Sequence, residues 1–112
     1  MNYRPLRVSK LIREELSVLV GRELEFDGAL PTITEVEVDK KLDTAKVLVS
    51  VFPTSKTDAV FKVLNAARFS LQHALKKKIN IKPMPKVVFI PDFGPANAAE
   101  VEKAFKKQRK MQ

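Results

Sequence analysis

The sequence predicts a single α+β domain of two layers, in which helices cover one small three-stranded sheet. Three observations support this fold class. The chain has 112 residues, a length that suits one domain rather than two. Hydrophobic residues make up 45% of it, which is enough for one modest core. Segments with helical periodicity are also separated by short runs rich in β-branched residues, the pattern of helices packed on a sheet.

The first helix is predicted from the start of the chain to a break at residues 26–31. Pro5 suits the first helical turn, where a backbone N–H has no partner in any case. Asp27, Gly28 and Pro31 are turn-forming residues that end the segment. Between these limits apolar side chains recur at the i, i+3, i+4 spacing of one buried stripe. They are Val8, Leu11, Ile12, Leu16, Leu19 and Val20.

Two strands are predicted next, at residues 32–39 and 44–52. Both segments alternate apolar β-branched residues with polar ones, as half-buried strands do. The connection between them is short enough for a hairpin. Three carboxylates on the first strand would then decorate the open side of the sheet, across from Lys46 of the second strand. These are Glu35, Glu37 and Asp39.

Helical periodicity resumes after residue 56 and continues to about Lys78. This stretch is long for so small a domain, so a break between Ala66 and Phe69 is expected, giving two helices at an angle. The prolines at 83 and 85 end the second of these helices. The apolar run at 86–90 predicts a third strand, either buried on both faces or central in the sheet. A last helix is predicted at 96–110, with Asn97 as its cap.

The charge of the chain points to a polyanionic partner. The formal net charge is +8 and the isoelectric point is about 9.9, which favours nucleic acid first and an anionic membrane second. Residues 1–13 and 59–91 contain no acid, whereas in residues 14–58 acids outnumber bases. Blocks of this kind suit a binding face. The candidate RNA-binding residues in these two blocks are Arg4, Arg7, Lys10, Arg68, Lys76, Lys77, Lys78 and Lys82.

Composition and motifs disfavour several other classes of protein. The absence of cysteine excludes a disulfide scaffold and a thiolate metal site, and it fits a reducing compartment. No apolar run approaches the roughly 18 residues that a membrane span needs, and the N-terminus does not resemble a secretory signal. We therefore expect a soluble cytoplasmic protein that has no metal site, no cofactor, no small-molecule substrate and no membrane partner.

Catalytic constellations are also missing from the sequence. It contains no phosphate-binding glycine-rich loop and no zinc-protease motif. His73 is the one histidine, and we expect it to be a packed or surface helix residue rather than a general base. The chain is therefore not expected to be an enzyme. Tyr3 and seven phenylalanines form no interleaved stacking platform, and most of the phenylalanines are expected in the core.

The predicted order of elements, helix-strand-strand-helix-helix-strand, is that of the type II KH domain. KH domains bind nucleic acid through a G-x-x-G loop that clamps the backbone. Here Gly21, Gly28 and Gly94 are never three positions apart, so this clamp is absent. The predicted fold is a type II KH-like domain without the clamp at residues 1–92, followed by a basic helix or tail at 93–112.

Four segments resemble the ribosome-binding factor A family, over roughly residues 4–92. They are the first helix at 7–16 (RVSKLIREEL), the hairpin at 32–39 (TITEVEVD) and 42–51 (LDTAKVLVSV), and the third strand at 85–92 (PKVVFIPD). The resemblance implies a KH-like monomer that binds the small (30S) ribosomal subunit and its 16S rRNA. It also implies assistance in late maturation, including 5′-end rRNA processing and notably in the cold, without enzymatic activity or cofactor.

The sequence departs from this family at one position of interest. Members typically carry Ala-x-Gly at the kink between the second and third helices, and the matching residues here are Ala67, Arg68 and Phe69. Phenylalanine lacks the freedom of glycine at positive φ, so we expect a shallower kink or one formed by other means. Two alternatives remain for the function. One is a small α+β interaction adaptor, and the other is a general binder of single-stranded nucleic acid that uses the sheet.

Overall fold

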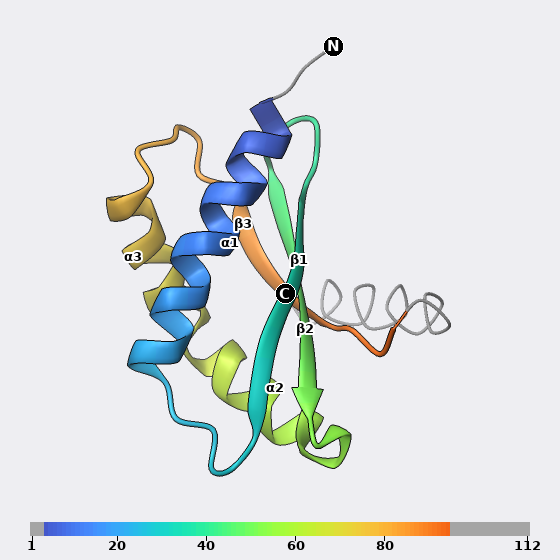
Figure 1. Ribbon diagram of the computed structural model, residues 1–112. Coiled ribbons are helices and arrows are strands. Elements are labelled where there is room, and N and C mark those ends of the chain that lie inside the picture. The colour runs from blue at the N-terminus through green and yellow to red at the C-terminus, as the bar shows by residue number, and fades with distance from the viewer. Residues whose placement is uncertain (1–3, 95–112) are drawn as a thin grey trace.

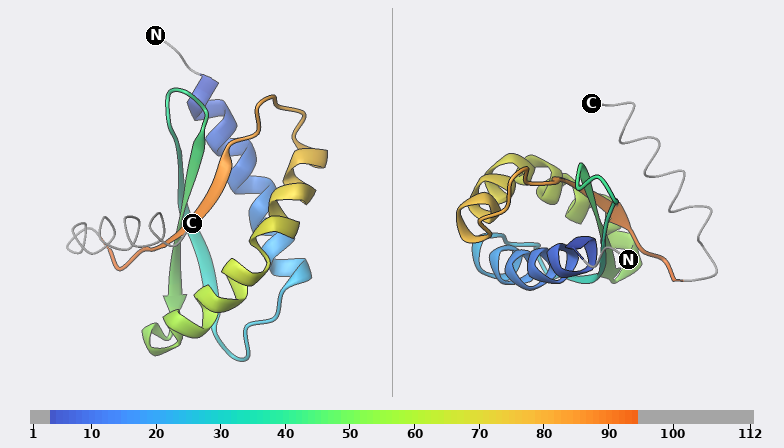
Figure 2. Two further views of the ribbon diagram at one scale, coloured as in Figure 1. Left: turned by 180° about the vertical axis from the view of Figure 1, so that it is seen from behind. Right: turned by 90° about the horizontal axis from the view of Figure 1, so that it is seen from above.

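The structure, a computed structural model, describes residues 4–94 (Figures 1 and 2). Its elements follow the order predicted from the sequence, with one short 3-10 helix added. The last helix expected at 96–110, with its Asn97 cap, lies outside the described residues. The elements are α1 (Arg4–Glu23), β1 (Leu30–Val38), β2 (Thr44–Phe52), η1 (Thr54–Lys56), α2 (Thr57–Ala66), α3 (Arg68–Lys78) and β3 (Lys86–Pro91).

The three strands form one sheet in the order β1-β2-β3. β1 and β2 pair antiparallel as a hairpin, and β3 pairs parallel to β2 after the crossover through α2 and α3. The third strand therefore lies at an edge of the sheet, and the expectation that it is the central strand is wrong. Its four apolar residues, 87–90, are nevertheless all buried. The other expectation, that the apolar side chains of this strand are buried on both faces, is confirmed. A strand at the edge of a sheet can have both faces covered, because burial of its side chains does not require a neighbouring strand on each side.

All three α-helices lie on one face of the sheet, which gives the two layers expected from the sequence (Figure 2). The core between the layers includes Ile12 and Leu16 of α1, Leu75 of α3 and Phe89 of β3, each with a fully buried side chain. Leu11 was expected in the same stripe but is 44% exposed. It sits one residue, or about 100° of helical rotation, from Ile12 and so falls at the margin of the stripe.

The break between the second and third helices occurs where it was expected, at Ala67. α2 ends at Ala66 and α3 begins at Arg68. Ala67 has φ −91° and ψ −1°, which is right-handed backbone that any residue can adopt. Its N–H still donates to the Val63 carbonyl at 3.1 Å. The break therefore forms without a glycine, and Phe69 simply occupies the first turn of α3.

Candidate nucleic-acid interface

The fold brings the two acid-free blocks of the sequence together. Arg4 lies in the first turn of α1, and Lys82 lies in the loop between α3 and β3. The Arg4 guanidinium is 3.5 Å from the Lys82 carbonyl oxygen, although 78 positions separate the residues. At this length the hydrogen bond is weak, but it shows that the two segments lie side by side. Both lie at the upper end of the molecule in Figure 1.

The cations of these two segments point to solvent. Arg4, Arg7 and Lys10 are exposed on α1. Arg7 and Lys10 lie on the side away from the buried Val8 and Ile12, whereas Arg4 precedes Val8 by four residues and lies near the same side, next to the loop that bears Lys82. The same holds in the last turn of α3, where three consecutive lysines are exposed around the buried stripe of that helix. None of these three ammonium groups forms an ion pair within residues 4–94. The three are Lys76, Lys77 and Lys78.

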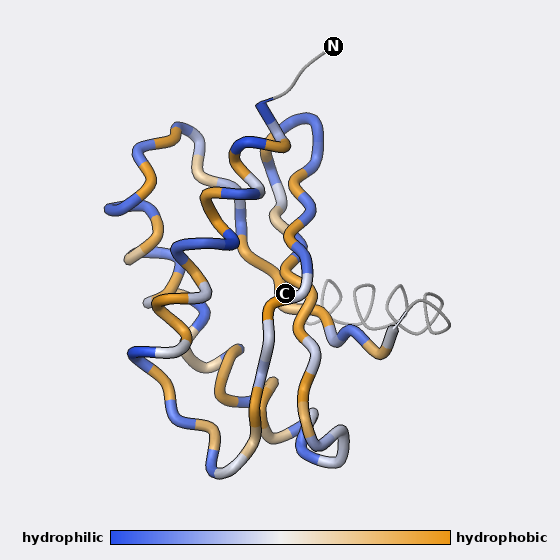
Figure 3. The backbone as a smooth tube through the Cα atoms, viewed as in Figure 1, coloured by the Kyte–Doolittle hydropathy of each residue, from blue (hydrophilic) through white to orange (hydrophobic). Residues whose placement is uncertain are grey.

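The turn of the β1–β2 hairpin lies at the same end and adds Lys40 and Lys41, both exposed (Figure 1). Sequence reasoning missed this pair because they sit in the acid-rich segment 14–58. One of the acids there serves the turn itself. The Asp39 carboxylate accepts hydrogen bonds from the N–H groups of Asp43, at 2.7 Å, and Thr44, at 3.2 Å. Figure 3 shows the hydrophilic hairpin turn near the hydrophilic start of α1.

Arg68 does not join this cluster. It lies eight to ten residues before the three lysines on α3, which corresponds to about 12–15 Å along the axis. Its guanidinium carbon instead lies 5.1 Å from the centroid of the Phe69 ring, a cation–π distance. The predicted kink motif and the predicted lysine cluster are therefore two separate places on the surface.

The phenylalanines are distributed differently from the expectation that most would be in the core. Six of them lie in the described part of the chain. Phe61 and Phe89 are buried, and Phe26 packs against the core while half-buried. The other half are exposed. The prediction does not hold for this half, because one of these rings ends β2, one lies in the first turn of α3 just after the helix break, and one follows β3. The exposed three are Phe52, Phe69 and Phe93.

The helix-free face of the sheet carries acid on β1. Glu35 and Glu37 are exposed there, and Glu37 lies directly across from Lys46, as predicted. Asp39 was expected to join them, but its carboxylate holds the hairpin turn instead. Carboxylates repel a phosphate backbone. The β1 part of this face therefore presents negative charge, whereas Lys46 of β2 and Lys86 of β3 lie on the same face.

A β-bulge on β1 places one further carboxylate near this strand. The register between β1 and β2 shifts around Thr34, and the Thr34 hydroxyl donates to Asp92 Oδ2 at 2.6 Å. The Gly94 N–H donates to Oδ1 of the same carboxylate at 2.9 Å. The hydrogen bond from Thr34, and then that from Gly94, lower the pKa of Asp92 below its ordinary value of 3.8, against the opposing effect of burial.

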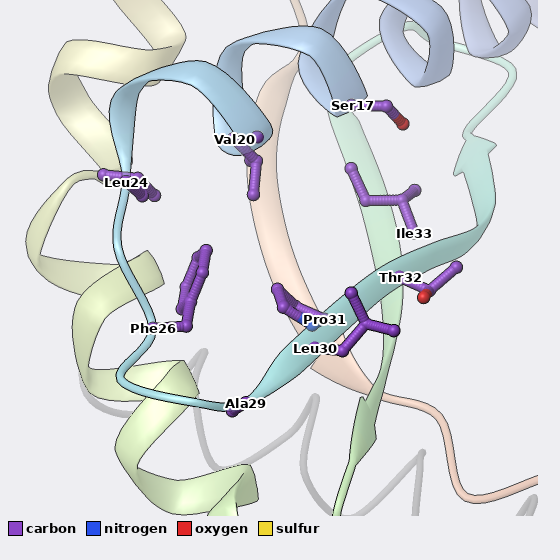
Figure 4. Close-up of a pocket in the computed structure, with 10 residues that line it drawn as sticks. Ser17, Val20, Leu24, Phe26, Ala29, Leu30, Pro31, Thr32 and Ile33 are labelled. Atoms are coloured by element: carbon purple, nitrogen blue, oxygen red, sulfur yellow. The ribbon is translucent and has the colours of Figure 1, made fainter.

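A groove of about 370 Å³ lies between the second half of α1 and the start of β1 (Figure 4). Its walls are mainly apolar, with Leu24 and Phe26 on one side and Ile33 on the other, and Ser17 and Thr32 supply its hydroxyls. None of its lining side chains is ionisable. In residues 4–94 no group of three or more histidines and acids is placed to hold a metal ion. The helices of that same range are too short or too polar to cross a membrane.

A family model decides the relationship of this chain to known proteins. The model described as ribosome-binding factor A matches residues 4–105. The chain belongs to the ribosome-binding factor A family. The family match extends past residue 92, where the resemblance read from the sequence stopped.

Individual members of the ribosome-binding factor A family cover most of the chain. The protein from Pelagibacter ubique is 30% identical over 117 residues, which span 98% of this chain and 93% of the relative. The one from Akkermansia muciniphila is 30% identical over 89 residues, spanning 80% of this chain and 71% of the relative.

Solved structures of ribosome-binding factor A share the fold. The crystal structure of the protein from Thermus thermophilus is 19% identical, covers 80% of this chain and 97% of its own, and superposes with a TM-score of 0.65. A homology model of the Thermus thermophilus protein was also fitted into a cryo-electron-microscopy map of its complex with the 30S subunit. It is 22% identical, with a TM-score of 0.59 over 78% of this chain and 89% of that one.

Proposed function

We propose that this chain is a non-catalytic assembly factor that binds the small ribosomal subunit through its 16S rRNA. It would assist late maturation of the subunit, including processing of the 5′ end of the rRNA, notably in the cold. Two findings support the binding partner, namely membership of the ribosome-binding factor A family and the 30S complex of the Thermus thermophilus relative. The observation that carries the proposal is the contact between Arg4 and Lys82, which unites the two acid-free blocks.

In this proposal the basic end of the domain acts as a phosphate-binding surface. We define the basic end as the start of α1, the end of α3 with the loop that follows it, and the hairpin turn. Contacts to phosphates position a protein on RNA but do not read its sequence. Specificity would then come from the shape of folded rRNA and from the ribosomal proteins nearby. The fold serves as a type II KH-like domain in which the basic end takes the place of the missing G-x-x-G clamp.

In this proposal the protein acts in the cytoplasm as a monomer and needs no cofactor. Residues 1–92 form its RNA-binding domain, and residues 93–112 contribute further positive charge. Phosphate contacts need only exposed cations, and Arg7, Lys10 and the lysines at the end of α3 supply them without help from a bound group.

One specific observation favours the adaptor alternative. Leu30 and Phe52 are paired across the β1–β2 hairpin and are both exposed. Leu30 also lines the groove of Figure 4, at the opposite end from the hairpin turn. An exposed apolar patch of this kind can mark a protein interface. If this patch mediates the main interaction, binding should persist at moderate salt, because apolar contacts do not depend on counterion release.

Co-sedimentation with purified ribosomal subunits in sucrose gradients tests the proposed function. The full chain should travel with small subunits at low salt, should leave them at moderate salt, and should not travel with large subunits. Co-sedimentation that is equal for both subunits would indicate a general binder of nucleic acid. Failure to associate with either subunit at low salt would overturn the proposal.

A further inference from the structure

We propose that Phe69, together with Arg68, forms a stacking site for an unpaired nucleobase of single-stranded RNA. The site lies at the break between α2 and α3, at the opposite end of α3 from the three lysines of the basic end. The inference rests on the proposed function, since it names a part of the RNA that this protein would contact. The Phe69 ring is not part of the hydrophobic core, so core packing does not explain an aromatic side chain at this position.

The first observation is the exposure of the ring. Phe69 is 74% exposed, whereas Phe61 of the preceding helix is buried. The Arg68 guanidinium lies at 5.1 Å from the ring centroid. A guanidinium at this distance is attracted to the ring and restrains its position. A restrained and largely exposed ring offers a preformed surface on which a base can stack, with little ordering left to do on binding.

The second observation is the space around the ring. The side chains just before it are small or short, namely those of Asn65 and Ala66, which are exposed, and Ala67, which is half-buried. The Ser70 hydroxyl donates back to the Ala67 carbonyl oxygen at 3.0 Å. Apart from Arg68, whose guanidinium lies over one face of the ring, the side chains of the helix break next to Phe69 are therefore too small to block a flat base.

The third observation is the charge around the ring. The segment 59–91 contains no acid, so no carboxylate of α3 repels the phosphates of a bound strand. Lys76 follows Phe69 by seven residues, which places it on the same side of α3, about 20° from Phe69 in rotation and about 10 Å along the axis. Lys76 is exposed. A base on Phe69 and a phosphate on Lys76 can then belong to one strand running along the helix.

These observations favour RNA over a protein partner. A nucleobase can stack on Phe69 while the phosphates of its strand contact Lys76 and Arg68, so an RNA ligand accounts for the ring and for both cations. An apolar contact with a protein partner would account for the ring alone. Stacking also differs from phosphate contact in its dependence on salt, because it releases no counterions. The stacking contribution to affinity should therefore survive at salt concentrations that remove the phosphate contribution.

The sequence allows a direct optical test, because it contains no tryptophan. Phe69→Trp places the one tryptophan of the chain at the proposed site, and excitation at the long-wavelength edge of its absorption band, where tyrosine no longer absorbs, keeps Tyr3 out of the signal. Phe52→Trp is the matched control, since Phe52 is also 74% exposed but lies at the end of β2. Each variant is titrated with purified small subunits and with a mixed-sequence single-stranded RNA oligonucleotide. The expected result is quenching of the Phe69→Trp emission by both ligands, and of the Phe52→Trp emission by neither.

A second pair of variants measures the contribution to affinity. Phe69→Ala should weaken binding to small subunits by about tenfold, with the same slope of log affinity against log salt, because stacking contributes a term of this size that does not depend on salt. Phe69→Trp should retain the affinity of the parent, and Phe52→Ala should match it. Thermal unfolding of each variant shows that the fold is intact, as is expected for exposed positions.

The failure of this inference is distinguishable from failure of the proposed function. If the Phe69→Trp protein co-sediments with small subunits and its emission does not change, the stacking site is wrong and the proposed function stands. If the oligonucleotide quenches the emission but subunits are not bound, the site is supported and the proposed function fails. A photoreactive phenylalanine at 69 that cross-links to a ribosomal protein, and not to rRNA, would overturn the stacking site.

Discussion

The side chain of Gln72 accepts a hydrogen bond from the backbone N–H of Val87, at 2.7 Å. The same amide donates to the Pro85 carbonyl oxygen, also at 2.7 Å. The opposite edge of this segment pairs toward β2, where the Lys86 N–H donates to the Asp43 carbonyl. Gln72 thus satisfies the outer edge of β3 as a further strand would. It also ties α3 to the segment that ends the loop bearing Lys82.

Gln72→Ala is expected to lower the free energy of unfolding by about 1–2 kcal/mol, because it leaves two backbone groups without their partner. Chemical denaturation monitored by circular dichroism measures this change. His73→Ala is the matched control at the next position, where the side chain is exposed. It should change stability by less than about 0.5 kcal/mol. Equal midpoints for the two variants would show that the two hydrogen bonds of the Gln72 side chain contribute nothing to stability.

Thr34→Val should raise the pKa of Asp92, because it removes the hydrogen bond that contributes most to lowering that pKa. The lowered pKa means that the ionised Asp92 stabilises the fold above the ordinary carboxyl pKa, near 4. This contribution is lost as the pH falls through the lowered value. The variant should therefore be less stable than the parent at pH 7, by about 1 kcal/mol, and the difference should shrink at low pH.

An NMR titration of the Asp92 carboxyl in both proteins, together with unfolding at pH 7 and at low pH, tests this prediction. Thr32→Val changes an exposed threonine of the same strand and should leave the Asp92 titration as it is in the parent. A loss of stability that is the same at pH 7 and at low pH would contradict the prediction, because it would show that the effect of Thr34 does not depend on the ionisation of Asp92.

Changing Lys76, Lys77 and Lys78 together to glutamine should weaken small-subunit binding strongly while changing stability little. In the last turn of α3 these lysines also complement the helix dipole, which is worth roughly 0.3–1 kcal/mol each at most. The two roles separate when affinity and unfolding are measured on the same triple variant. A variant that unfolds earlier but binds subunits as well as the parent would reduce these lysines to a helix-capping role.

Lys40 and Lys41 should contribute to subunit binding in the same way, although they come from the acid-rich part of the sequence. The double change to glutamine should weaken co-sedimentation at a fixed low salt, since two phosphate contacts are lost. Lys56 is the matched control, because it lies at the other end of the hairpin and donates to the Asp27 carbonyl oxygen at 3.0 Å. Equal losses for Lys56→Gln and for the double variant would contradict a localised basic end.

Local patterns in the sequence predicted most of the fold. Period-two alternation located the hairpin strands, and the length of the second helical segment, from about residue 57 to Lys78, predicted the break that the structure has at Ala67. Pairing between distant segments could not be obtained in this way. The edge position of β3 depends on the crossover through α2 and α3, and the role of Gln72 depends on how α3 packs beside β3. A glutamine among other polar residues of a helix gives no indication in the sequence that its side chain will bond to the backbone of a strand.

The candidate site was predicted in part, for a similar reason. Counting acids along the chain identified Arg4 and Lys82 separately, and only the fold shows that they are neighbours. The same count did not identify Lys40, because acids outnumber bases in the segment around it. One of those acids, Asp39, uses its carboxylate to hold the hairpin turn by hydrogen bonds. Phe69 was assigned to a motif by its position, whereas its 74% exposure is set by the break that precedes it.

The central claim is that the start of α1 and the end of α3 act as one phosphate-binding surface, and the salt dependence of small-subunit binding tests it most directly. Log affinity should fall linearly with log salt, with a slope of about −0.7 to −0.9 per phosphate contact. Neutralising Arg4, Arg7 and Lys10 should make that slope shallower, and so should neutralising the three lysines that end α3. A parent protein whose affinity is flat between low and moderate salt, or a slope unchanged in both variants, would contradict the account.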